Sequence, residues 1–244
     1  MRSARLALPR SQTIVKEGDL VTLDPAEARH GVLSLRLKPG DPIELMGPDG
    51  SAPARVAEAL KGASPSLKAL VTGPYEASPP ANGPVLLLSL IRPARFEWAV
   101  EKGVELGASK LIPVISSRCR VRGDSVGASK LERWNRIAVE AGKQSGRTFP
   151  LVLRPPAGLS ELLEEYGAKK DEYALYIMDG EGAPPRPPEN NSPSVILVGP
   201  EGGFTPEEKQ AARDSFFTPV SLGAITLRSE TAALAALCIL GRKT

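Results

Sequence analysis

The sequence predicts an α/β protein in which a small β-rich domain precedes a domain built on a mostly parallel sheet. Three observations carry this prediction. The second part of the chain contains four short, continuous apolar runs, which are typical of strands buried on both faces of a parallel sheet. Amphipathic helical patterns lie between those runs. The first part contains short strand-like segments separated by turn residues instead.

The first domain is predicted over residues 1–74, followed by a linker rich in glycine and proline at residues 73–84. Strand-like segments lie at 20–23, 42–46 and 67–71, and Gly-Pro-Asp-Gly at 47–50 is a turn signal. The domain has no Phe, Trp or Tyr before position 75, so base stacking on aromatic side chains is not expected there. Any nucleic-acid contact from this domain has to come from arginines. The candidates are Arg5, Arg10, Arg29 and Arg36.

The second domain is predicted over residues 84–244. Its apolar runs lie at 85–91, 111–115, 173–178 and 195–198. A helix with buried positions between 96 and 104 is expected to end at Gly107. Ser129 and Glu132 suggest a capping box for a second helix, and Thr205 and Glu208 suggest one for a third. A last helix is predicted from about Ser229 onwards.

The composition excludes several classes of protein. Of 244 residues, two are cysteines and one is a histidine, which leaves no disulfide framework, no cysteine zinc site and no histidine-based zinc hydrolysis. We therefore expect no metal. The apolar run at 85–91 is too short to cross a bilayer, so we expect no membrane partner and a cytoplasmic location.

Positive charge is concentrated in one segment of the chain. Residues 110–154 contain ten Lys or Arg against three Asp or Glu, a net charge of +7, whereas the whole chain carries +3. Such a segment suits a phosphate backbone. It is equally typical of a solvated basic face, and the sequence pattern alone does not choose between the two.

Two strand ends carry candidate chemistry, because ligands of open α/β sheets bind beyond the carboxyl ends of the strands. The first is Gly-Pro-Glu-Gly-Gly at 199–203, whose amides can approach a ligand closely. It is neither a Walker loop nor a dinucleotide-binding motif. By glycine count alone, a plain strand–turn–helix connection is the favoured interpretation.

The second strand end lies at residues 222–232, where Arg228 immediately precedes a helix. A plain helix start explains Ser229 as its cap and Glu230 as a favourable charge in its first turn. It does not explain Arg228, because a cation is disfavoured at the positive end of a helix. We therefore expect a ligand-binding role for Arg228.

Five segments, in order and spacing, resemble the RsmE family of 16S ribosomal RNA uridine-N3 methyltransferases, of the SPOUT class. They are residues 95–107, residues 112–119 with Ile112, Pro113 and Cys119, residues 133–150, residues 199–208, and residues 222–232. Weaker resemblances in the first domain include His30 and Arg36. The sequence departs from the family pattern at Arg95, Ser229 and Ile225, and within residues 30–36, where one expected arginine is missing.

The resemblance implies a PUA-like β-barrel followed by a SPOUT domain with a C-terminal trefoil knot, and a homodimer formed through the knotted domain. It implies S-adenosylmethionine as cofactor and 16S rRNA, or the small ribosomal subunit, as partner. Arg228 and Glu230 are the implied catalytic residues. The implied cofactor-binding residues are Leu197, Gly199, Glu201, Gly202, Leu222, Gly223, Leu227 and Thr231. The implied RNA-binding residues are Arg5, Arg36, Arg95, Arg118, Arg120, Lys143, Gln144 and Arg147.

Several alternatives stay open at this point. Glu230 is expected either to orient Arg228 or to accept the proton of the uridine, and His30 is favoured as a structural hydrogen-bonding residue over a catalytic base. The small residues of the last helix, Ala232, Ala233, Ala235 and Ala236, suit core packing or a dimer interface. A ribosome-assembly protein that only binds RNA, or a SPOUT methyltransferase acting on another RNA, are the alternative functions.

Overall fold

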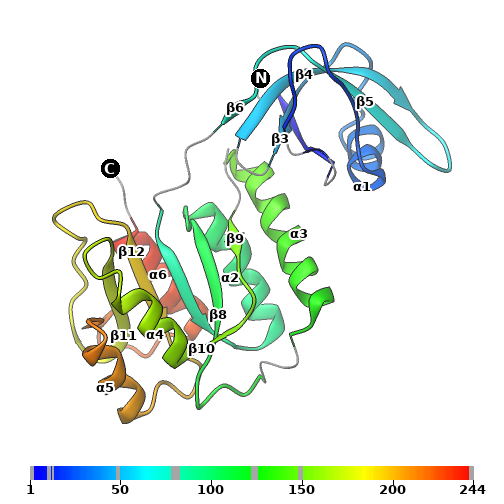
Figure 1. Ribbon diagram of the computed structural model, residues 1–244. Coiled ribbons are helices and arrows are strands. Elements are labelled where there is room, and N and C mark those ends of the chain that lie inside the picture. Colours follow the sequence, from blue (N-terminus) through cyan, green and yellow to red (C-terminus); the bar gives the residue numbers. More distant parts are fainter. Residues whose placement is uncertain are drawn as a thin grey trace. The chain divides into compact units, whose positions relative to one another are not determined.

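The computed structural model in Figure 1 describes residues 3–9, 12, 14–47, 50–77, 83–121, 126–147 and 151–241. Contacts divide the chain into two units. The first contains Met1–Ala81 with Gly146–Pro150, and the second contains Asn82–Ser145 with Leu151–Thr244.

The first unit is built on a mixed sheet that packs around a core of small aliphatic side chains. Its strands follow the order β1-β3-β4-β5-β2, with β6 paired to β4. Only the β1–β3 pair is parallel among the described strands of this sheet. The strands are β1 (Ala4–Ala7), β2 (Leu20–Thr22), β3 (Pro42–Met46), β4 (Gly50–Leu60), β5 (Ser66–Val71) and β6 (Glu76–Ala77). Helix α1 (Pro25–Arg29) continues into a π-helical turn, η1 (His30–Ser34).

The three strands predicted in this unit are confirmed as β2, β3 and β5. The prediction that residues 73–84 form only a linker was wrong at β6, because Glu76–Ala77 pairs with Gly50 and Ser51 of β4. Residues 78–82 of the predicted linker, and Arg10 among the predicted RNA contacts, lie outside the described residues.

The second unit is built on a sheet in which every described pair of strands is parallel. The strand order is β10-β8-β7-β12-β11-β13, with β9 paired to β8. The strands are β7 (Val85–Ser89), β8 (Lys110–Ile115), β9 (Val152–Leu153), β10 (Ala157–Gly158), β11 (Ala174–Ala183), β12 (Ser194–Val198) and β13 (Thr218–Val220). The helices are α2 (Pro93–Glu105), α3 (Ala128–Ser145), α4 (Leu159–Gly167), α5 (Pro206–Asp214) and α6 (Ser229–Leu240).

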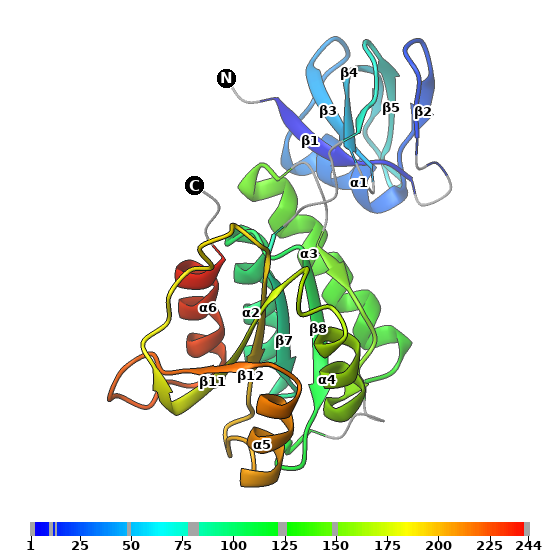
Figure 2. The same ribbon diagram turned by 60° about the vertical axis from the view of Figure 1, so that its left-hand side comes forward.

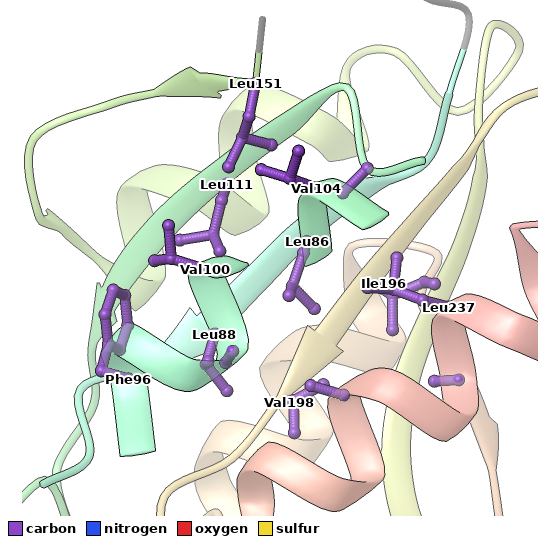
Figure 3. Packing of buried hydrophobic residues seen from close by; sticks show 14 of the residues in the cluster. Leu86, Leu88, Phe96, Val100, Val104, Leu111, Leu151, Ile196, Val198 and Leu237 are labelled. Carbon is purple, nitrogen blue, oxygen red and sulfur yellow. The ribbon is translucent and has the colours of Figure 1, made fainter. Parts of the chain in front are cut away.

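Helices cover both faces of this sheet, as the continuous apolar runs predict. Figures 1 and 2 show α2, α3 and α6 on one face and α4 and α5 on the other. Alternate residues of β7 enter opposite cores: Leu86 and Leu88 pack with α2 and α6, whereas Val85 and Leu87 pack with α4. The first of these cores is shown in Figure 3. Because side chains alternate along a strand, an uninterrupted apolar run is what two covered faces require.

The helix boundaries test the local signals. Thr205 caps α5 in a complete capping box, since its side chain accepts from the Glu208 amide and the Glu208 carboxylate accepts from the Thr205 amide. The capping box predicted at Ser129 was wrong, because α3 already begins at Ala128. Gly107 and Gly146 follow α2 and α3 with positive φ, as helix-ending glycines do.

No helix within the described part of the chain is long and apolar enough to span a membrane. The described residues also contain no group of three or more His, Cys, Asp or Glu side chains arranged to hold a metal ion.

Candidate active site

A pocket of about 740 Å³ lies at the carboxyl edge of the parallel sheet, within the second unit. Strands β12, β11 and β13 are consecutive in the sheet and parallel, so their carboxyl ends share one edge. The pocket is lined by residues 178–180, 198–204 and 220–229, together with Arg118, Lys209 and Ala232. Both loops that the sequence singled out therefore line one pocket.

Six of the eight predicted cofactor-binding residues line this pocket. They are Gly199, Glu201, Gly202, Leu222, Gly223 and Leu227. The other two do not line it. Leu197 is fully buried in the core beneath α4, and Thr231 is exposed on α6, next to the lining residue Ala232.

The glycine-rich loop at 199–204 is held in place by the neighbouring loop that follows β8. The guanidinium of Arg118 donates to the carbonyl of Gly202 (3.0 Å) and to that of Phe204 (3.4 Å). The Ser117 amide donates to Glu208 at 2.7 Å. Since Glu208 also caps α5, it joins the start of that helix to the β8 loop. Arg118 thus supports the wall of the pocket.

Two glycines permit the backbone of the two loops to turn where they do. Gly203 has φ +67° and Gly223 has φ +112°, values that residues with a Cβ rarely adopt. A Cβ built on either glycine meets nothing within 4 Å. Backbone conformation, and not lack of space, therefore selects glycine at both positions.

Arg228 lines the pocket as an exposed side chain at the N-cap position of α6. None of the described residues hydrogen-bonds or ion-pairs with its guanidinium. Ser229 was predicted to cap the helix, but the helix already includes Ser229 and the cap residue is Arg228, which makes no side-chain capping bond. A cation at the positive end of a helix is electrostatically disfavoured. Within the described part of the chain, no structural interaction explains a guanidinium at this position on the pocket wall.

Glu230 lies behind Arg228, in the first turn of α6, and its side chain is only 8% exposed. Its Oε1 is 3.5 Å from Nε of Arg95, and a second nitrogen of Arg95 is 3.6 Å from Glu201. The other oxygen, Oε2, is buried and accepts no hydrogen bond from the described residues. Arg95, on the first turn of α2, therefore joins both loops of the site, and Glu230 contacts Arg95 without a hydrogen bond to Arg228.

The third wall of the pocket contains a charged pair that the sequence reasoning missed, Asp179 and Lys209. Lys209 Nζ lies 2.7 Å from Asp179 Oδ1, and Arg213 lies 3.5 Å from the other oxygen. Burial acts to raise the pKa of Asp179, but the hydrogen bonds from Lys209 and the Glu181 amide, with the charge of Arg213, outweigh it and lower that pKa. The available signal was a carboxylate directly after the apolar run at 173–178.

The matching family and relatives agree with this geometry. Residues 81–241 match the family described as RNA methyltransferase domain. The chain is 31% identical over 216 residues to ribosomal RNA small subunit methyltransferase E of Rickettsia conorii, over 83% of this chain and 81% of that protein. The chain belongs to the RsmE family. Relatives of the same name from Mesomycoplasma hyopneumoniae (33% identity, 64% of this chain) and Aquifex aeolicus (34%, 59%) are matched over 67% and 62% of their own lengths.

Solved structures extend the RsmE resemblance to the whole chain. A ribosomal RNA small subunit methyltransferase E from Neisseria gonorrhoeae, bound to S-adenosyl methionine, is 30% identical with a TM-score of 0.80 over 97% of this chain and 95% of that one. A putative methyltransferase from Legionella pneumophila, in complex with bound SAM, is 27% identical with a TM-score of 0.81 over 97% and 96%. The α/β fold with its parallel sheet is thus the fold of RsmE structures.

Eight residues are predicted from the RsmE resemblance to bind RNA. Four of them have partners within their own unit. Arg5 pairs with Glu44 at 2.6 Å, Lys143 with Glu140 at 2.9 Å, and Arg95 and Arg118 are engaged as described above. Arg36 and Arg120 are exposed, and no described residue bonds to their side chains.

The last two RNA-binding candidates, Gln144 and Arg147, lie outside the lining of the pocket. Gln144 lines a separate groove between α2 and α3, beside Glu105, about 15 Å along α2 from Arg95. Arg147 follows the end of α3 and belongs to the first unit, where burial lowers its pKa to about 10. It still carries its charge at neutral pH.

The net charge of +7 in residues 110–154 does not form one free basic surface. Acidic side chains pair with several of its cations. Glu97, which lies outside the segment, makes a bidentate pair with Arg133, and one nitrogen of Arg154 donates to both oxygens of Glu165. A charge count along the sequence cannot include partners that only the fold brings close.

Proposed function

We propose that the protein transfers a methyl group from S-adenosylmethionine to N3 of a uridine in 16S rRNA of the small ribosomal subunit. One observation carries this proposal. In a chain of the RsmE family, an arginine without a partner among the described residues, Arg228, lies on the wall of a pocket formed by the two glycine-containing loops. A function limited to RNA binding gives no reason for such a pocket.

The pocket suits the proposed cofactor in size and charge. Its volume of about 740 Å³ lies within the range of small-molecule sites. Gly199, Gly202 and Gly203 line the pocket and bring backbone without a Cβ to its wall. The carboxylate of Glu201 complements a positively charged sulfonium. S-Adenosylmethionine supplies an electrophilic methyl group there, and this chain's residues have to prepare the nucleophile.

Arg228 is the proposed catalytic residue. N3 of uridine is a poor nucleophile until its proton is removed, and the negative charge that results spreads over N3 and the flanking oxygens. A guanidinium beside the base stabilises that charge, and loss of one comparable donor raises a reaction barrier by about 3 kcal/mol. Since no described residue uses the Arg228 guanidinium, it is available to the base without breaking an interaction.

Glu230 is proposed as a positioning residue. Its carboxylate is buried, lies outside the pocket lining and contacts Arg95, which also reaches Glu201. It thereby ties the first turn of α6, and with it Arg228, to α2. The alternative role, accepting the proton of N3, predicts that Glu230→Gln abolishes methylation at every pH, whereas a positioning role predicts a partial loss.

RNA contacts are proposed for Arg36 and Arg120, because both are exposed cations without a described partner. They would bind phosphates and set the register of the strand, while the target base is unstacked and enters the pocket. A structural role, through the bonds within the protein described above, is proposed instead for Arg5, Arg95, Arg118 and Lys143.

We further propose, from the family, a PUA-like barrel in residues 1–74, a knotted SPOUT domain in residues 84–244 and a homodimer acting in the cytoplasm. Ala233 and Ala236 of α6 are buried in the core, which supports the packing role of the small residues. Ile225, in the loop before α6, is 80% exposed, and Ile239, near the end of α6, is 37% exposed. These exposed apolar side chains support a second copy of the chain as the partner that covers them.

The function is tested with purified small ribosomal subunits or 16S rRNA from cells lacking the enzyme, incubated with the protein and S-adenosylmethionine. Nuclease digestion and mass spectrometry should show one new 3-methyluridine. A different methylated nucleoside would assign another RNA reaction. Cofactor binding or RNA binding without any methylated product would favour the assembly-protein alternative.

A further inference from the structure

The third wall of the pocket, which contains Lys209 and Asp179, has no role in the mechanism proposed above. Lys209 lies on α5, one residue after the capping Glu208, and its side chain lines the pocket with 26% of its surface exposed. The Asp179 side chain is 2% exposed and fixes the Lys209 ammonium from beneath at 2.7 Å. The exposed Glu181 is farther away, at 3.9 Å.

Among the described residues that line the pocket, three are cations. Arg118 is committed to the carbonyls of Gly202 and Phe204, and Arg228 is assigned to the target base. Lys209 is the remaining one. An ammonium has three N–H donors, and Asp179 Oδ1 takes one of them at 2.7 Å. The lysine therefore keeps the capacity to bind an anionic group inside the pocket.

We propose that Lys209, positioned by Asp179, binds the carboxylate of the amino-acid tail of S-adenosylmethionine. This inference rests on the proposed function. The cofactor has two positive groups, its sulfonium and its α-ammonium, and the carboxylate is its one negative group. A fixed ammonium attracts that group and repels the other two. Lys209 thus orients the tail toward the β11 wall and leaves Glu201 to the sulfonium.

The test compares two ligands that differ only in this carboxylate, S-adenosylmethionine and decarboxylated S-adenosylmethionine, by calorimetry on the full chain. We expect the native protein to bind the first about tenfold more tightly, as a partly exposed charge-assisted hydrogen bond implies. In Lys209→Met this ratio should fall to about one. Arg213→Met is the matched control, because Arg213 contacts the same Asp179 without lining the pocket, and it should keep the native ratio.

Each outcome separates the two proposals. Equal affinities for the two ligands in the native protein, or an unchanged ratio in Lys209→Met, would overturn the role of Lys209 and leave the proposed function intact. Failure of the native protein to bind either ligand would refute the proposed function itself. 5′-Methylthioadenosine, which lacks the whole tail, should bind Lys209→Met as it binds the native protein, which shows that the variant pocket is folded.

Discussion

The two glycine-containing loops line one pocket but are held very differently. Residues 199–204 are anchored by side chains from elsewhere in the second unit: Arg118 reaches the carbonyls of Gly202 and Phe204, and Arg95 reaches Glu201. Residues 223–228 are all exposed, and no side chain from another described segment hydrogen-bonds to residues 222–228. Side chains of the second unit therefore hold the wall formed by residues 199–204, whereas few described side chains hold the wall formed by residues 222–228.

This difference separates two uses of arginine at one site. The guanidinium of Arg118 donates to backbone carbonyls, so its effect on a ligand is indirect. Arg228 has no described partner, so its interactions remain for the ligand. Removing the first should change the shape and stability of the pocket, and removing the second should change the reaction.

The largest expected effect is that of Arg228→Ala on turnover. Loss of the guanidinium should slow single-turnover methylation by at least a hundredfold, because charge on the uridine is no longer stabilised. Cofactor affinity by calorimetry and the melting temperature should change little, since Arg228 makes no described bond in the folded protein. A variant with normal turnover would remove Arg228 from the mechanism.

Arg118→Ala should show the opposite pattern. Two hydrogen bonds to backbone carbonyls are lost from an exposed side chain, so the free energy of unfolding should fall by about 1 kcal/mol, with weaker cofactor binding. Urea unfolding and calorimetry measure the two. Arg120→Ala, two residues away and without a described partner, is the matched control and should leave both unchanged. If Arg118→Ala alters only RNA affinity, Arg118 is a phosphate contact after all.

A smaller effect is expected from alanine at the two glycines with positive φ. Gly203→Ala should lower the free energy of unfolding by about 1 kcal/mol. The anchored loop cannot move to relieve the backbone strain of an alanine with positive φ. Gly223→Ala should cost less than half as much, because the exposed loop can shift. Equal costs in urea unfolding would show that both loops are equally fixed.

The smallest expected effect is the loss of stability at acid pH that follows from the pairing of Asp179 in the third wall. The pKa of Asp179 is lowered in the folded protein, so its pairing stabilises the protein above the unfolded pKa of about 4 and is lost as the pH falls through the folded value. The stability difference between the native protein and Asp179→Asn should therefore be constant from pH 7 to 5 and begin to shrink near pH 4. A constant difference down to pH 3 in urea unfolding would contradict the pairing.

Local signals in the sequence predicted much of the fold. The apolar runs gave four strands of the parallel sheet, because strands buried on both faces leave little room for polar residues. Thr205 and Glu208 marked the start of α5 because a capping box involves only residues three positions apart. The prediction at Ser129 was wrong for the same local reason: the spacing was present, but α3 begins two residues too early for Ser129 to cap it.

The folded chain brings Arg228 and six of the eight residues that the RsmE resemblance implied for cofactor binding to one pocket, because parallel strands bring the loops after them to one edge. The sequence did not predict which charged residues remain available. Arg95 and Arg118 resemble RNA contacts, yet both bind partners far away in the sequence, which only the folded chain brings close. Lys143 pairs with Glu140 of its own helix, three positions away.

The sequence by itself thus determined the class of sheet, the two loops and the arginine between the second loop and its helix, since each depends on patterns within a few residues. Only the tertiary structure decided that Arg118 holds a wall while Arg228 has no partner among the described residues, and that Asp179 and Lys209, thirty positions apart, form the third wall. The physical reason is that a charge acts through its nearest partners in space, and a parallel sheet brings together side chains that the chain order keeps apart.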